Sequence, residues 1–283
     1  SPNPKYLFRS TDNECEAMMA SLLVIKHWKG KFVKVAGINP DYSYGRNNMA
    51  AFIAVLKRFN IEHQVVTEQW PKVGTMDLTS HVAALKAAKP DLSGSSRWGA
   101  ERPGGRKQAH AAGLTEGTKL VFPAAGWQHT LMKKEFTPEG MLFGHNTLYF
   151  ANPKNSATAK EFVAWYGDKY KDYPEWEADR AYFALESYKQ AVEKAMKAKG
   201  GWPSQDDVIQ AMIGLEIESL GGKGAWRKDK IADQTFVQGF TTHKNNYDFV
   251  TLAEPFDTMY SADLQKPPGA NFWEWIKTAK FNV

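Results

Sequence analysis

Cysteine is nearly absent from this chain of 283 residues, in which Cys15 stands alone. A single cysteine excludes an internal disulfide bond and any zinc site built from several cysteines. The seven histidines are dispersed, and no two of them have the spacing of metal ligands. We therefore expect neither a metal site nor a cofactor.

Long apolar runs are also missing, because the longest fall far short of the ~20 residues that a membrane-spanning helix needs. The first nine residues, SPNPKYLFR, have neither the basic nor the apolar region of a signal peptide, and we interpret them as a processed or truncated end. The net charge of +5 comes from scattered residues rather than from one basic tract. Nucleic-acid binding is therefore not expected.

The composition is ordinary for a globular protein, and its clearest pattern is FVKVAGINPDYSYGRNNMAAFIAVLKRF at residues 32–59. The Val- and Ile-rich segment Phe32–Asn39 predicts a buried strand, and Pro40–Tyr44 has the composition of a turn. From Asn47 onward, apolar residues recur every three or four positions, which predicts an amphipathic helix. The pattern is that of a strand, loop and helix unit.

Ligands in open α/β sheets bind where strands end and helices begin, so the loop of this unit is the first candidate for a binding site. Its polar and aromatic side chains are Asp41, Tyr42 and Tyr44. The alternative is an ordinary connection whose tyrosines pack against their neighbours, since most such loops touch no ligand.

Strands alternate with helices from residue 32 to residue 150. Further strands are expected at Glu62–Gln69, Lys119–Pro123 and Gly140–Phe150, and further helices at 12–29 and Leu78–Ala88. Such alternation predicts an α/β fold with a parallel sheet that is covered on both faces.

One segment, LSGSSRWGAERPGGRK at residues 92–107, interrupts this alternation. Strand propensity is poor across Leu92–Arg97, and Pro103–Gly105 is expected to break a helix at its start. Two interpretations remain, a remodelled loop at the cleft or a local error in the sequence. The flanking segments keep the expected register, which favours the second.

The second half of the chain differs from the first. A helix at Ser156–Tyr173 is followed by a long helix at Ala178–Lys199, without a strand between them. This order indicates a different lobe. The inner face of the long helix is expected to carry Ala181, Leu185, Tyr188, Val192 and Ala195.

No catalytic constellation is present: there is no Gly-x-Ser-x-Gly motif, no phosphate-binding loop and no helical pair of histidines. What remains is a set of aromatic and polar groups at the ends of expected strands, namely Tyr42, Tyr44, Trp98, and Trp127 with Gln128. A small-molecule pocket has this character, being mostly apolar and aromatic with a few oriented polar groups.

Several segments can be read together: YLFR at 6–9, FVKVAGINPDYSYGRNNMAAF at 32–52, and then LKAAKPDL, KQAHAAGL, PEGMLFG and AYFALESYKQAVEKA. They resemble the periplasmic solute-binding proteins of branched-chain amino-acid-type ABC transporters, up to about residue 239. The resemblance implies a type I periplasmic binding fold, with two three-layer α/β lobes whose parallel sheets are joined by crossovers at a hinge. The lobes close on a ligand in the cleft.

Members of that family usually begin with a further half-lobe, so the resemblance implies an incomplete first lobe here. The expected parts are the second lobe at 10–148, a helical remainder of the first lobe at 149–222, and a return to the second lobe with a tail at 223–283.

The resemblance also implies site residues. Tyr44 matches a ligand-contacting tyrosine before a glycine, Tyr182 matches a tyrosine that often faces the cleft, and Trp98 lies near a second aromatic contact. An acidic residue that often binds a ligand's ammonium group would fall near Ala124–Ala125, where no carboxylate exists. This departure argues against a leucine-type site and leaves room for amides, urea-like solutes or aromatic acids.

We therefore expect a non-enzymatic periplasmic protein that delivers a small polar organic solute, such as an amino acid, amide or aromatic acid, to an ABC transporter permease. The expected ligand contacts are Asp41, Tyr42, Tyr44, Trp98, Trp127 and Tyr182. One alternative is a ligand-sensing domain of the same fold. Another is an α/β enzyme that uses Asp41 or His129 as an acid–base group, but the sequence offers no nucleophile or base pair for it.

Overall fold

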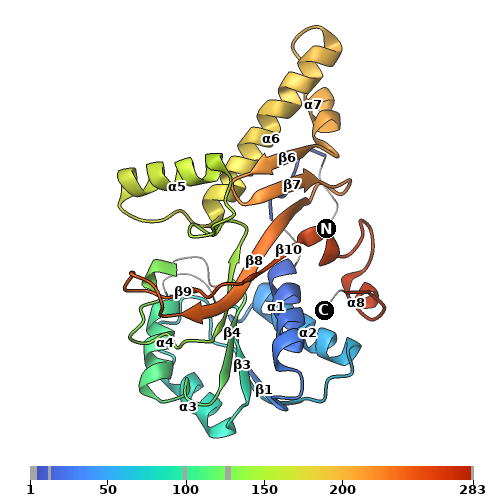
Figure 1. Ribbon diagram of the computed structural model, residues 1–283. Coiled ribbons are helices and arrows are strands. Elements are labelled where there is room, and N and C mark those ends of the chain that lie inside the picture. Colours follow the sequence, from blue (N-terminus) through green and yellow to red (C-terminus); the bar gives the residue numbers. More distant parts are fainter. Residues whose placement is uncertain (1–4, 12–13, 98–100, 125–128, 282–283) are drawn as a thin grey trace.

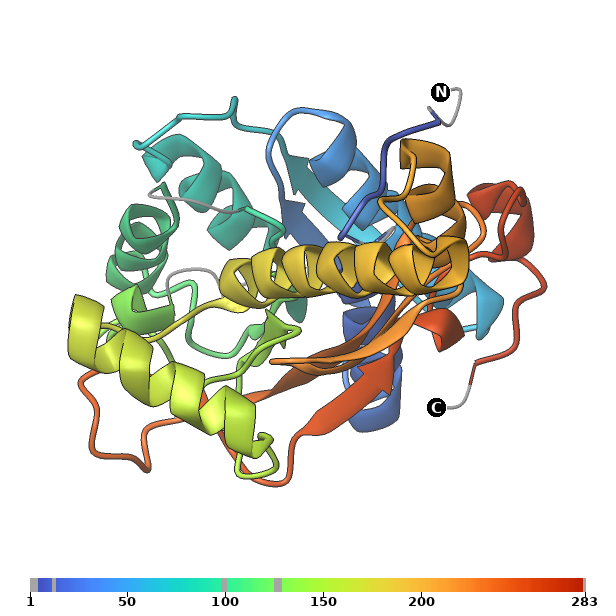
Figure 2. The ribbon, with the colours of Figure 1, turned by 90° about the horizontal axis from the view of Figure 1, so that it is seen from above.

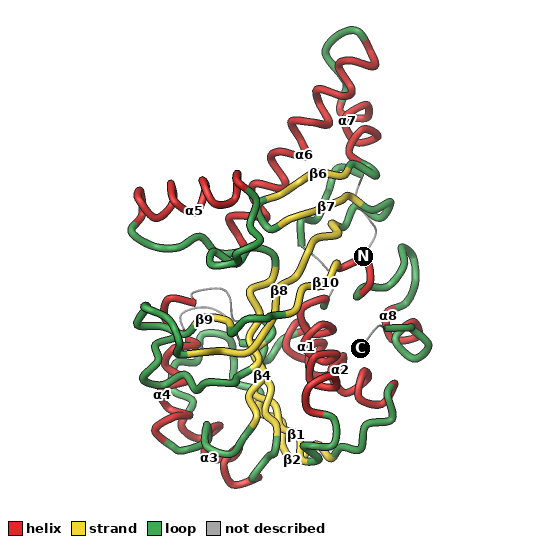
Figure 3. Tube along the Cα trace, viewed as in Figure 1, coloured by secondary structure: helices red, strands yellow, loops and turns green. Residues whose placement is uncertain are grey.

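The computed structural model of the protein describes residues 5–11, 14–97, 101–124 and 129–281, with the backbone alone at residues 101–103. A long sheet runs through this part of the chain in the order β2-β1-β3-β4-β5-β8-β7-β6, and β9 and β10 also pair with β8 (Figures 1 and 3). The strands are β1 (Lys34–Ile38), β2 (Gln64–Gln69), β3 (Leu92–Gly94), β4 (Lys119–Phe122), β5 (Leu142–Asn146), β6 (Glu216–Ser219), β7 (Gly222–Trp226), β8 (Ala232–Thr242), β9 (Thr251–Leu252) and β10 (Asp257–Tyr260).

Helices pack around this sheet. They are α1 (Cys15–Trp28), α2 (Ser43–Arg58), α3 (Thr79–Ala88), α4 (Glu101–Ala111), α5 (Ala157–Tyr170), α6 (Trp176–Lys199), α7 (Gln205–Met212) and α8 (Phe272–Trp275), with short 3-10 turns at His129–Leu131 and Ser261–Asp263. Of the described helices, none combines the length and the apolar character that crossing a bilayer requires.

Strands β1 to β5 run parallel, which confirms the prediction from the alternating pattern. On one face, α1 and α2 form a buried cluster with strand residues such as Val35 and Val121. On the other face, Val82 and Leu85 of α3 pack against Ala36 of β1. Both faces of the parallel sheet are therefore covered, because its strands are apolar on both sides.

A second group of elements lies at the other end of the sheet and consists of α5, α6, α7 and the β6–β7 hairpin (Figures 1 and 2). Phe183 of α6, Val208 of α7 and Trp226 of β7 share one buried cluster there. Strand β8 belongs to both groups, because Ala232–Gln234 pair with β7 whereas Val237–Phe240 pair with β5.

Helix α2 begins at Ser43, four residues before the expected start, so Tyr44 and Gly45 lie in its first turn rather than in the preceding loop. A Cβ atom at Gly45 would lie 2.1 Å from the carbonyl oxygen of Pro40. The glycine lets the chain fold back tightly against the new helix.

The irregular segment at 92–107 forms the strand and helix that the alternation requires, although its composition argued against both. Leu92 is fully buried and β3 pairs with β1 and β4, so a central position in the sheet overrides the poor strand propensity. The expectation that Pro103–Gly105 breaks the helix is wrong. Proline is tolerated in the first turn of a helix, where its missing N–H group has no partner to lose. A Cβ atom at Gly105 would lie 2.7 Å from Cδ1 of Leu78, so this glycine permits close packing.

The expected inner face of α6 is wrong at three positions, because Ala181 is exposed, Leu185 is 72% exposed and Tyr188 is 56% exposed. The helix instead buries Phe183, Ser187 and Ala191. Apart from Phe183, small and polar side chains form the packed face, because the β6–β7 hairpin and α7 approach closely there. The hydrophobic pattern therefore did not mark it.

The backbone of Gly144 in β5 packs directly against the backbone at the end of β4. A Cβ atom at Gly144 would lie 1.8 Å from the carbonyl oxygen of Pro123, whereas one at Gly94 in β3 would meet no atom of the described residues within 4 Å. We expect Gly144→Ala to lower the free energy of unfolding by about 2 kcal/mol or more, since overpacked cores rarely relax without backbone movement. Urea denaturation measures this loss. Gly94→Ala is the matched control, and an equal effect of both substitutions would refute the explanation.

His145 lies among aromatic rings at the end of the same strand. It is 2% exposed, and its ring centroid lies 4.3 Å from that of Tyr149, 4.9 Å from that of Phe143 and 5.2 Å from that of His129. Burial, and to a smaller extent the neighbouring His129, hold the pKa of His145 well below its ordinary value. Folded His145 therefore stays neutral where the same residue in the unfolded chain binds a proton.

The contribution of neutral His145 to the free energy of unfolding is therefore expected to be fully present above the ordinary histidine pKa. It should fall as the pH drops below that value. The loss from this residue is about 1.4 kcal/mol per pH unit below pH ~6.5. Thermal unfolding followed between pH 7.5 and pH 5 checks this, and His145→Phe should flatten the dependence. His110→Gln, at an exposed histidine, is the control that should leave the dependence unchanged. A full dependence in His145→Phe would contradict the prediction.

Candidate functional site

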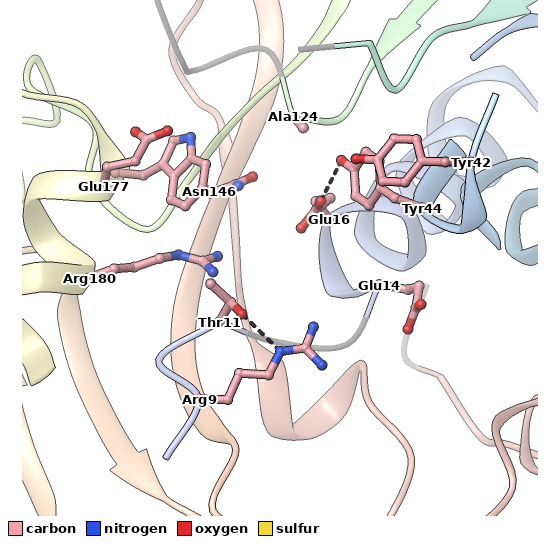
Figure 4. Close-up of a pocket in the computed structure, with 11 residues that line it drawn as sticks. Arg9, Thr11, Glu14, Glu16, Tyr42, Tyr44, Ala124, Asn146, Glu177 and Arg180 are labelled. Atoms are coloured by element: carbon pink, nitrogen blue, oxygen red, sulfur yellow. Dashed lines mark hydrogen bonds between the residues drawn. The ribbon is translucent and has the colours of Figure 1, made fainter. Parts of the chain in front are cut away.

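A cavity of about 390 Å³ lies where the two groups of elements meet (Figure 4). It is lined by Arg9, Thr11, Glu14, Glu16, Tyr42, Tyr44, Ala124, Asn146, Trp176, Glu177 and Arg180. These residues come from the N-terminal segment, the starts of α1, α2 and α6, and the ends of β4 and β5. The cavity therefore lies at the carboxyl ends of parallel strands, where α/β sheets bind their ligands.

One wall is built by the first turns of α1 and α2. The hydroxyl group of Tyr44 donates a hydrogen bond to Oε1 of Glu16 at 2.8 Å, and Glu16 is only 8% exposed. The amide of Gln238 in β8 donates to the carbonyl oxygen of Glu16 at 2.8 Å and so fixes the start of α1. The ring of Tyr42 lies beside that of Tyr44, with the ring centroids 5.9 Å apart and the ring planes tilted by 31°.

The opposite wall is the first turn of α6. The guanidinium group of Arg180 lies 4.3 Å from the centroid of the Trp176 ring, a cation–π arrangement. Asp179 points away from the cavity, accepting hydrogen bonds from Oγ of Ser219 at 2.5 Å and from the backbone N–H of Gly221 at 2.9 Å. These bonds anchor α6 to the β6–β7 hairpin and so set the position of the wall.

The N-terminal segment closes a third side. Nε of Arg9 donates to Oγ1 of Thr11 at 2.9 Å. The backbone N–H of Arg9 donates to the carbonyl oxygen of Lys230, and its carbonyl oxygen accepts from the N–H of Ala232. The segment is therefore held beside the start of β8, with Arg9 directed to the cavity (Figure 4).

Charges of both signs surround the cavity. Arg9 and Arg180 carry positive charge, whereas Glu14, Glu16 and Glu177 carry negative charge. Arginine matches a carboxylate geometrically, and carboxylates accept hydrogen bonds from amino and amide groups. With the tyrosine and tryptophan rings, this arrangement can hold a small solute that has separate donor and acceptor groups.

Some predicted site residues lie at this cavity and others do not. Tyr42 and Tyr44 line it. Asp41 does not, since its carboxylate is exposed and pairs with Arg46 at 2.6 Å, and Arg46 stacks over Trp70 at 3.8 Å. Tyr182 also lies elsewhere, packed against a buried cluster that includes Leu148 and Leu220. Trp98 and Trp127 are outside the described residues.

Sequence reasoning did not select Arg9, Glu16, Asn146, Trp176 or Arg180. Ala124 lies at the cavity and supplies no carboxylate there, but Glu14 and Glu16 bring acidic groups from another element. A usable signal existed for α6 alone, because Asp179 and Arg180 stand at the start of a long helix, where charged residues can face a cleft even though most such runs are solvated. The other residues are brought together only by the topology.

The described residues include no group of three or more His, Cys, Asp or Glu side chains that could hold a metal ion. His129 is 1% exposed, and its ring stacks on Phe150 at 4.8 Å. It does not line the cavity, and neither does Asp41.

Comparison with solved structures identifies the fold as the type I periplasmic binding protein fold. A solute-binding protein of an ABC transporter from Rhodopseudomonas palustris BisB5, in complex with 3,4-dihydroxybenzoic acid, is 24% identical with a TM-score of 0.74, over 93% of this chain and 69% of that chain. An amino acid ABC transporter substrate-binding protein from Pseudomonas fluorescens Pf-5 is 16% identical with a TM-score of 0.74, over 99% of this chain and 70% of that chain.

A leucine-, isoleucine-, valine-, threonine- and alanine-binding protein from Brucella ovis, in a closed conformation, is 21% identical with a TM-score of 0.73, over 93% of this chain and 67% of that chain. No curated protein matches the sequence. The model of the periplasmic binding protein family matches residues 1–241, and the chain belongs to this family.

The bond between Tyr44 and Glu16 should contribute to stability as well as to the shape of the wall. We expect Tyr44→Phe to lower the free energy of unfolding by about 1–2 kcal/mol, because a buried carboxylate loses a hydrogen-bond donor. Tyr188→Phe, at an exposed tyrosine, should change it by less than about 0.5 kcal/mol. Urea denaturation of the unchanged protein and of both variants measures these differences. Equal free energies of unfolding in all three would show that the bond contributes nothing.

Proposed function

We propose that this protein binds a small polar organic solute, an amino acid, an amide or an aromatic acid, in the cavity between its two groups of elements. One observation carries the proposal: a cavity of about 390 Å³ combines tyrosine and tryptophan rings with a few charged groups of both signs. Small-molecule sites have this size and this character.

Membership of the periplasmic binding protein family supports the proposal. The Rhodopseudomonas structure holds an aromatic acid, and the Brucella protein is named for aliphatic amino acids. Both kinds of solute carry a carboxylate, for which Arg9 and Arg180 are suitable partners.

We infer further that the bound solute is delivered to the transmembrane subunits of an ABC transporter, and that the protein works in the periplasm. The two groups of elements then act as two lobes that close on the solute. The lobes expected from the sequence are 10–148 and 149–222, with 223–283 returning to the lobe of 10–148. Because Trp226 and Ala232 pack with α6 and α7, we propose that the return comes later than residue 223, within β8.

An enzymatic role for Asp41 or His129 has less support. Asp41 pairs with Arg46 at the surface, and His129 lies within an aromatic cluster. General acid–base catalysis needs such groups within hydrogen-bond reach of a bound substrate.

Thermal unfolding in the presence of amino acids, carboxamides and aromatic acids tests the proposed function. A solute present at about 100 times its dissociation constant should add about 2.7 kcal/mol to the stability of the folded protein, because it binds the folded state alone. The melting temperature should rise accordingly. Failure of every solute class to stabilise a demonstrably folded protein would contradict the proposal.

The position of the site is tested by two matched substitutions. Glu16→Gln should weaken binding of an amine-bearing solute about tenfold, or about 1.4 kcal/mol, because it removes a charged acceptor from the wall. Asp41→Asn changes a nearby carboxylate that lies outside the cavity, and it should leave the affinity unchanged. Isothermal titration calorimetry measures both, and the reverse result would move the site to the Asp41 loop.

A further inference from the structure

Two buried polar atoms at the cavity have no hydrogen-bond partner among the described residues. One is Oδ1 of Asn146, a residue that is 2% exposed, and the other is Nε1 of Trp176. Both residues line the cavity, and Figure 4 shows the Asn146 amide turned toward the space between Glu16 and Arg180. Buried polar atoms are nearly always satisfied in folded proteins, and a solute in this cavity would supply the partners that both atoms lack.

The backbone at Asn146 is unusual as well. Its φ angle is 53°, in the left-handed region where residues other than glycine are uncommon. The residue ends β5, where the pairing with β8 changes register after Gly144. Irregularities of this kind re-aim side chains beside binding and active sites. A strained backbone and an unsatisfied acceptor at one residue are features that proteins retain at functional sites.

We propose that Asn146 determines the specificity of the site by accepting a hydrogen bond from an N–H group of the solute. The inference rests on the proposed function, since it concerns the same cavity. Trp176 Nε1 then donates to an oxygen atom of that solute. Carboxamides and amino acids carry an N–H donor and an oxygen acceptor together, whereas a simple carboxylate carries acceptors alone.

The charges around the cavity lead to the same solute class. Glu14, Glu16 and Glu177 outnumber Arg9 and Arg180 by three formal charges to two. A carboxylate without an amino group would add negative charge beside this excess, whereas an amino acid or a neutral amide would not. The cavity is therefore selective for N–H-bearing solutes over carboxylates of the same carbon skeleton.

The test uses solutes that differ in the N–H group, paired as benzamide with benzoate, L-leucine with 4-methylpentanoate, and L-phenylalanine with 3-phenylpropanoate. Calorimetric titration of the whole protein should show the N–H-bearing member of at least one pair binding about tenfold more tightly than its partner. A site built to hydrogen-bond a donor rejects an analogue that lacks it, because its own acceptor is left unpaired.

Three variants assign this preference to one side chain. Asn146→Gly removes the acceptor and suits the left-handed backbone, so the preference should fall to about threefold or less. Asn146→Asp keeps an acceptor and should keep the preference. Asn60→Gly is the matched control, since Asn60 has a φ angle of 51°, is exposed and does not line the cavity. It should bind as the unchanged protein does.

Each outcome is decisive. If the unchanged protein prefers the N–H-bearing member in none of the pairs, or if Asn146→Gly keeps the full preference, the role of Asn146 is refuted while the proposed function stands. If the folded, unchanged protein binds none of the six solutes, the proposed function fails and this inference fails with it.

Discussion

The buried carboxylate of Asp179 joins three parts of the chain that are distant in sequence. It binds Ser219 and Gly221 in the β6–β7 hairpin. A Cβ atom at Gly221 would lie 2.6 Å from Asp179 Oδ2 and 2.7 Å from the carbonyl oxygen of Thr147, so the chain after β5 is packed into the same contact. Hydrogen bonds to a charged group contribute about 1.5–3 kcal/mol each. The first turn of α6, and with it Trp176 and Arg180, owes its position to this contact.

The walls of the candidate site depend on contacts of this kind, because no wall is formed and held in place by a single helix or strand. Glu16 is fixed through Gln238 of β8, Arg9 through backbone pairing beside the same strand, and Arg180 through the neighbouring Asp179. Glu16, Arg9 and Arg180 are thus positioned by contacts that lie behind the cavity wall. Oriented polar groups of this kind lose little conformational entropy when a solute binds.

The sequence allowed much of the fold to be predicted and less of the site. Periodicity located β1, α2 and the parallel sheet, because buried strands and amphipathic helices leave local patterns. It failed at Leu185 and Tyr188, because α6 packs through small and polar residues. Tyr44 was found through its place after a strand and through family resemblance. Glu16 and Asn146 could not be found, because only the strand order brings them to one cavity.

Strand β8 crosses from one group of elements to the other without a break, pairing with β7 at its start and with β5 farther along. A continuous strand resists sharp bending, since a bend would break the ladder on both sides. In the closure that we propose, a change in the width of the cavity therefore requires β8 to twist or bend together with the strands that pair with it.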